Sequence, residues 1–82
     1  MADITPSIEQ IIDATGGKES RDGTSVVVGY GPLGYIRVTP DYAIVDGQER
    51  PAARVEGKLS RRNGAAHAEL RAALEAAGIR PR

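Results

Sequence analysis

The chain has 82 residues, which is enough for one small domain (residues 1–82). It contains no Cys, Phe or Trp, so disulfides and cysteine-ligated metal sites are excluded and the core must be built mainly from Ile, Val and Leu. The 11 basic and 11 acidic side chains leave no net charge, but they are unevenly spread. Residues 1–47 carry three basic and seven acidic side chains (−4), and residues 48–82 carry eight basic and four acidic ones (+4). This asymmetry can steer a partner or drive self-association, or the two halves can simply attract each other in the fold.

Residues 5–15 are expected to form the first helix. Thr5 is the expected N-cap and Pro6 the first helical residue, where its missing N–H costs nothing. One apolar stripe should face the core, formed by Ile8, Ile11 and Ile12. Gly16 and the glycine after it should end the helix.

The middle of the chain is expected to form three or four short strands. These are residues 24–30, 35–39 and 42–45, and less regularly 49–56. Residues 18–23 should be a polar loop, Pro40-Asp41 a turn, and Asp46-Gly47 the tight turn of a hairpin. Pro51 should restrict the fourth strand to an edge or to a strand start. In residues 35–39, alternation places Ile36 and Val38 on one face of the sheet and Tyr35 and Arg37 on the other.

Residues 57–64 are expected to be a basic, flexible stretch, followed by a helix over residues 65–77. Ser60 or Asn63 should cap that helix, and Gly78 should end it. The expected fold is therefore α+β. It has a three- or four-stranded antiparallel meander with an N-terminal and a C-terminal helix packed on one face.

Residues 29–34 read Gly-Tyr-Gly-Pro-Leu-Gly and match the glycine pattern of dinucleotide-binding folds. That pattern must lead into a helix, whereas the residues after Gly34 are typical of a strand. The strand–loop–strand context resembles the glycine-rich loop of protein kinases, but the chain lacks a kinase's other catalytic segments. We interpret the motif as a tight hairpin turn.

No group of residues suggests an active site. His67 is the only histidine, and the acidic residues are dispersed without the spacing of a general acid–base pair. We expect no enzyme activity, no cofactor and no metal. No targeting segment or membrane-spanning stretch is visible, so we expect a cytoplasmic protein. The excess of Arg over Lys, with abundant Ala and Gly, suggests a bacterial or phage genome.

A mixed aromatic and basic surface is the strongest functional candidate, because Tyr and Arg are enriched at binding hot spots. The candidate binding residues are Tyr30, Tyr35, Arg37, Tyr42, Arg54, Arg61 and Arg62. A wider basic group adds Arg50, Lys58, Arg80 and Arg82, which could contact phosphates. The alternative is that the tyrosines complete a small core that lacks Phe and Trp.

These residues favour a small non-catalytic domain that binds another protein or a protein–nucleic-acid complex. In size and build, though in no motif, the chain resembles the compact inhibitors of phages and mobile elements, such as anti-CRISPR proteins. That resemblance implies an inhibitor that occupies a surface of a larger bacterial complex. The alternatives are a nucleic-acid-binding module that stacks bases on the sheet, and a structural subunit of a phage or oligomeric assembly, including a homodimer.

Overall fold

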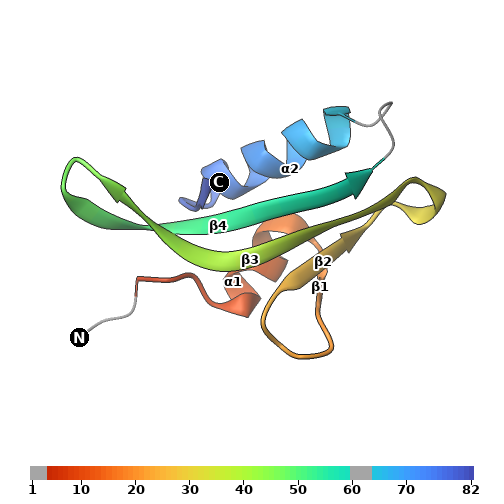
Figure 1. Cartoon of the computed structure of the whole chain (residues 1–82), viewed down its shortest axis with the longest axis horizontal. Coiled ribbons are helices and arrows are strands. Elements are labelled where there is room, and N and C mark those ends of the chain that lie inside the picture. Colours follow the sequence, from red (N-terminus) through yellow and green to blue (C-terminus); the bar gives the residue numbers. More distant parts are fainter. Residues whose placement is uncertain (1–3, 60–63) are drawn as a thin grey trace.

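The computed structural model describes residues 4–59 and 64–82, and it contains two α-helices and one mixed five-stranded sheet (Figure 1). In chain order the elements are α1 (Ile8–Thr15), β1 (Lys18–Glu19), β2 (Val26–Gly29), the 3₁₀ turn η1 (Gly31–Leu33), β3 (Gly34–Val45), β4 (Gln48–Leu59), α2 (Gly64–Ala76) and β5 (Arg80–Pro81). The strands lie in the order β1-β2-β3-β4-β5. The α+β class is confirmed, while the sheet has more strands than we predicted and its last strand runs parallel to β4.

Strand β3 is continuous, so the predicted turn at Pro40-Asp41 is wrong. Pro40 pairs with Ala53, whose carbonyl accepts the N–H of Arg82 at 2.8 Å on the β5 side. The N–H and C=O of one residue point to the same side of a strand. Both groups of Ala53 therefore face β5, and neither needs a hydrogen bond with Pro40. The nitrogen of Pro40 instead faces the edge of β3 that β2 leaves open, since β2 ends its pairing at Val38. A proline without N–H is tolerated there.

The turn between β3 and β4 is the predicted Asp46-Gly47 pair. Both residues have positive φ, 53° and 77°, as a two-residue hairpin turn of this hand requires. The resulting ribbon has twelve residues in each strand and is about 40 Å long at ~3.3 Å per residue. It accounts for the longest dimension of the molecule, which measures 42 × 27 × 16 Å.

Two very short strands complete the sheet, and neither was predicted. Lys18 and Glu19, expected in a loop, pair with Val27 and Val26 as β1. At the other edge, α2 ends at a glycine cap in which the Ile79 N–H donates to the Leu74 carbonyl at 2.9 Å, as predicted for Gly78 (φ 79°). This cap turns the chain back along β4, where Arg80 and Pro81 lie beside Ala52 and Ala53.

The start of α1 differs from the prediction. Ser7, not Thr5, is the N-cap, and its hydroxyl accepts the Gln10 N–H at 3.1 Å. The Gln10 side chain accepts the Ser7 N–H in return at 2.7 Å. This reciprocal capping box satisfies two helix-end donors, which a cap at Thr5 followed by Pro6 does not achieve. The predicted caps of α2, Ser60 and Asn63, lie outside the described residues.

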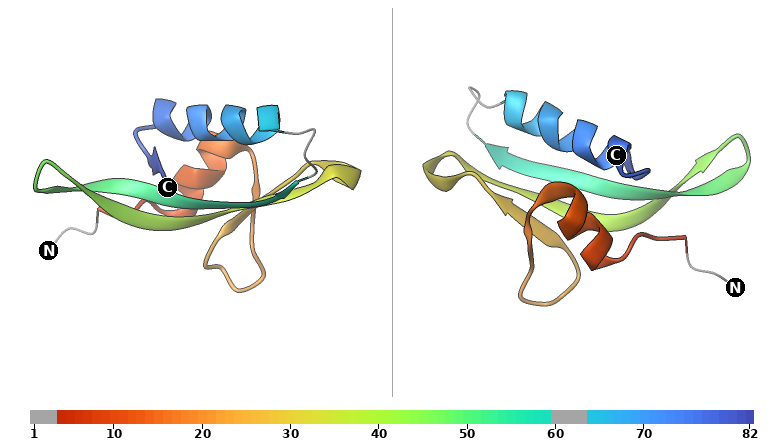
Figure 2. Two further views of the ribbon diagram at one scale, coloured as in Figure 1. Left: turned by 45° about the horizontal axis from the view of Figure 1, so that its top comes forward. Right: turned by 180° about the vertical axis from the view of Figure 1, so that it is seen from behind.

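Both helices pack against the same side of the sheet and against each other (Figure 2). The core is one cluster of buried residues from both helices and the sheet, including Ile11, Val26, Ile36, Val38, Leu70 and Leu74. The expected inward positions of Ile36 and Val38 are confirmed, as is the stripe of isoleucines on α1. The opposite side of the sheet carries no helix, so its side chains are available to other molecules.

Gly17 sits where α1 meets β2, and a Cβ there would lie 2.7 Å from Val26 Cγ1 and 2.8 Å from the Val27 carbonyl oxygen. We predict that Gly17→Ala lowers the free energy of unfolding by about 1–3 kcal/mol, because the backbone cannot yield to this contact. Gly29→Ala is the matched control, since a Cβ there meets nothing within 4 Å. Urea unfolding measures both, and equal stability of the two variants would contradict the prediction.

The loop before β2 is held by Asp22, whose Oδ1 accepts hydrogen bonds from the hydroxyls of Ser20 (2.6 Å) and Thr24 (2.8 Å). These bonds, the one from Ser20 foremost, lower the pKa of Asp22 from 3.8 to about 2. A lowered folded-state pKa stabilises the fold above pH ~4, and this contribution is lost as the pH falls toward ~2. Asp22→Asn should therefore weaken the acid dependence of unfolding in that window. Carboxyl ¹³C NMR gives the direct check, because Ser20→Ala should raise the Asp22 pKa, and a wild-type midpoint near 3.8 would refute the account.

Candidate functional site

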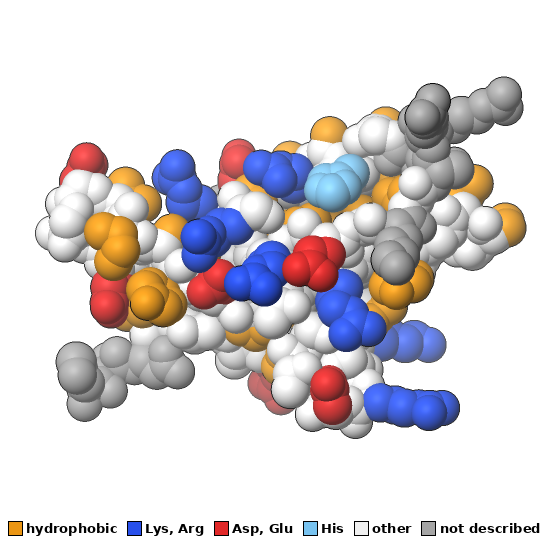
Figure 3. All heavy atoms as spheres, viewed as in Figure 1, with side chains coloured by type: hydrophobic (Ala, Val, Ile, Leu, Met, Phe, Trp, Pro, Cys, Tyr) orange, Lys and Arg blue, Asp and Glu red, His pale blue; other side chains and the backbone are white. Residues whose placement is uncertain are grey.

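The side of the sheet without helices, which we call the open face, is defined by the alternation of side chains along each strand. Tyr35 and Arg37 lie on it, as the sequence predicted, and both are exposed. The paired residues of neighbouring strands place further side chains beside them. Figure 3 views this face and shows Lys and Arg side chains gathered over the strands, with Asp and Glu side chains between them.

The open face carries more positive than negative charge among the described side chains. By register, its basic residues are Lys18, Arg37, Arg50, Arg54, Arg80 and Arg82, and its acidic residues are Asp41 and Glu56. The exposed charged residues of the two helices show the reverse balance: Glu9, Asp13, Glu69 and Glu75 against Arg71. The two faces therefore differ in charge, but this difference does not follow the asymmetry along the sequence, since Lys18 and Arg37 come from the acidic half and Glu69 and Glu75 from the basic half.

We call Tyr35, Arg37, Arg54 and Arg82 the central patch of this face. Arg82 Nη1 lies 3.0 Å from Asp41 Oδ2 and also donates to the Tyr42 carbonyl at 3.0 Å. Arg54 Nη1 lies 3.9 Å from Glu56 Oε1 with both side chains mostly exposed, so this pair contributes little to stability. Within the described residues Arg37 has no ion pair, which leaves its guanidinium available to a partner.

The open backbone edge of β3 next to this patch is protected. Pro40 has no N–H, the Tyr42 N–H donates to Asp41 Oδ1 at 2.8 Å, and the Tyr42 carbonyl is taken by Arg82. Proline and charged side chains at such an edge discourage the addition of a further strand. Addition of a further strand at Pro40 and Tyr42 is therefore disfavoured.

The other candidate residues are not brought together with Tyr35. Tyr30 is half-buried and packs against the core, where burial first and the charge of Glu69 second raise its pKa. Tyr42 is 49% exposed, but it lies four residues after Val38 in the same strand and so points to the same side of the sheet. It is therefore on the helix side of the ribbon, beyond the helices. One tyrosine thus serves the core and two remain at the surface. Arg61 and Arg62 lie outside the described residues.

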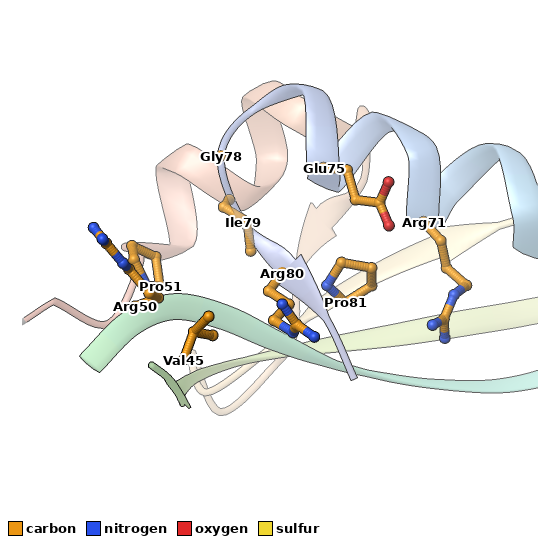
Figure 4. Close-up of a pocket in the computed structure, with 9 residues that line it drawn as sticks. All are labelled: Val45, Arg50, Pro51, Arg71, Glu75, Gly78, Ile79, Arg80 and Pro81. Carbon is orange, nitrogen blue, oxygen red and sulfur yellow. The ribbon is translucent and has the colours of Figure 1, made fainter. Parts of the chain in front are cut away.

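A groove is present at the β5 edge, where the end of the hairpin approaches the last turn of α2 (Figure 4). We call this the edge groove, and its volume is about 570 Å³. Its apolar lining consists of Val45, Pro51, Ile79 and Pro81. Its charged lining consists of Arg50, Arg71, Arg80 and Glu75. The sequence did not predict the short strand β5, and it therefore did not predict the groove that β5 helps to line.

The glycine-rich segment has a structural role here. Residues 29–34 join two antiparallel strands through η1, with the Tyr30 N–H donating to the Gly34 carbonyl at 2.9 Å, so the motif does not open a nucleotide-binding helix. His67 is half-buried, and a Cβ at Gly57 would lie 3.4 Å from its Nδ1. Among the described residues no group of three acidic or histidine side chains is arranged to hold a metal ion.

Comparison with known proteins gives no relative. No family model matches the chain, and neither a curated protein nor a solved structure is significantly similar to it. In residues 4–59 and 64–82, neither helix has the length and apolar character of a membrane span.

Proposed function

We propose that this chain is a small non-catalytic domain that binds another protein through the central patch of its open face. The observation that supports this most strongly is the separation of charge, with exposed Tyr35 and a row of arginines on one side of a thin slab and acidic helices on the other. A partner with an acidic surface is complementary to this face.

The arrangement favours a protein partner over a nucleic acid. Two of the three arginines of the central patch are balanced by carboxylates, Arg54 by Glu56 and Arg82 by Asp41. A phosphate backbone would be repelled by these two carboxylates, whereas a protein surface can match a mixed pattern of charge. Tyr35 is also the only tyrosine on the open face, which leaves single-stranded bases one stacking platform instead of several.

Such a domain suits an inhibitor that acts by covering a surface of a larger bacterial complex, in the manner of the anti-CRISPR proteins. Its twelve-residue ribbon forms a preformed surface, so little conformational entropy is lost on binding. No chemistry is needed for this activity, because occupation of the partner's surface is sufficient.

Charge reversal on the patch tests the proposal. Arg37→Glu should reduce capture of the partner from a nuclease-treated bacterial lysate by about ten-fold or more, because an Arg at the centre of an interface contributes about 2 kcal/mol or more. Arg21→Glu is the control, since it makes the same charge change in an exposed loop away from the patch. Quantitative mass spectrometry measures both captures, followed by binding of the purified partner.

Two results would contradict the proposed function. In the first, Arg37→Glu and Arg21→Glu reduce capture of the partner equally. This would mean that binding depends on net charge and not on the central patch. The second is Arg37-dependent capture from an untreated lysate that nuclease treatment abolishes and purified DNA or RNA restores, which would identify a nucleic-acid-binding module.

A further inference from the structure

The edge groove has the charge of an anion-binding site. Arg50 comes from β4, Arg71 from α2 and Arg80 from β5, so three elements place arginines along the lining of one groove, with their guanidinium groups spread along it (Figure 4). None of the three forms an ion pair within the described residues, and Arg50 Nη2 only donates to Gln48 Oε1 at 2.7 Å. Glu75 is the one negative lining residue, so the groove has a net charge of +2.

The floor of the groove is apolar. Ile79 is 4% exposed and Pro81 is buried, while Val45 and Pro51 are half-buried on the opposite wall. The volume of about 570 Å³ is in the range of small-ligand pockets and can hold an aliphatic side chain with its neighbours. A bare phosphate would leave the half-buried Val45 and Pro51 uncovered. No aromatic residue among those that line the groove offers a surface for a base to stack on.

We propose that the edge groove binds an acidic peptide segment in which carboxylates flank one aliphatic side chain. The carboxylates pair with Arg50, Arg71 and Arg80, and guanidinium groups suit such two-pronged contacts. The aliphatic side chain packs against the half-buried Val45 and Pro51. This site is separate from the central patch and does not depend on the function proposed for it.

The test uses the full chain, labelled with ¹⁵N, and a blocked pentapeptide with four Glu around a central Leu. Amide shifts in ¹H–¹⁵N spectra should be confined to the groove, at residues 45, 50, 71 and 79–80. Arg71→Glu should weaken the peptide about ten-fold or more, as expected when one charge-assisted contact becomes a repulsion. Glu75→Gln should strengthen binding about two- to five-fold, because it removes the one negative lining charge.

Control ligands and a control variant complete the experiment. Peptides with Gln for Glu, or with Ala for Leu, should bind more weakly than the parent peptide. Arg37→Glu should leave peptide binding unchanged, so failure of the groove and failure of the central patch are distinguishable. The proposal is overturned if Arg71→Glu binds the peptide normally, or if the shifts map to the central patch. It is equally overturned if inorganic phosphate or a short single-stranded oligonucleotide gives the same groove shifts as the peptide.

Discussion

The pairing of β3 with β4 is the interaction on which the rest of the structure depends. These two strands pair over twelve residues each, whereas β1, β2 and β5 pair over two, four and two residues. A chain without Phe or Trp has few large side chains to bury, and a long antiparallel ribbon gives them a continuous surface to pack on. The helices lie over the middle of that ribbon and over its end near Leu59, so the end at the Asp46-Gly47 turn extends beyond them (Figure 1). The exposed Tyr42 and Ile44, and one wall of the edge groove, are direct results of this difference in length.

The same ribbon explains why the molecule has two unlike faces. An antiparallel sheet needs only one covered face, and successive side chains point to opposite sides. In β3 this places Ile36 and Val38 under the helices and Tyr35 and Arg37 in solvent. Ala52, on the open face, is fully buried although no helix covers it, which fits the cover that neighbouring long side chains such as that of Arg82 provide. The arginines of this face thus shield the sheet as well as present charge.

Local signals in the sequence predicted much of this fold. Alternation gave the two faces of β3, Asp46-Gly47 gave the hairpin turn, and Gly78 gave the end of α2, because each depends on the conformation of a few neighbouring residues. What escaped prediction depends on tertiary contacts. Pro40 looked like a strand breaker, yet it lies in β3 because its missing N–H faces an edge that β2 does not reach. Strands of two residues, β1 and β5, have no periodicity to detect. The central patch was foreseen in part, at Tyr35, Arg37 and Arg54, while the separation of Tyr30 and Tyr42 from it depended on packing and on where the helices end.

The small thickness of the molecule affects its electrostatic interaction with an approaching molecule. Its shortest dimension is 16 Å, while electrostatic screening in physiological salt acts over about 8 Å. A molecule approaching one side is therefore shielded from most of the charge on the other side, and it does not experience the zero net charge of the chain. Among the described residues, opposite charges are separated across the thickness of the sheet, and we expect this dipole to favour approaches in which the strands meet a negative surface.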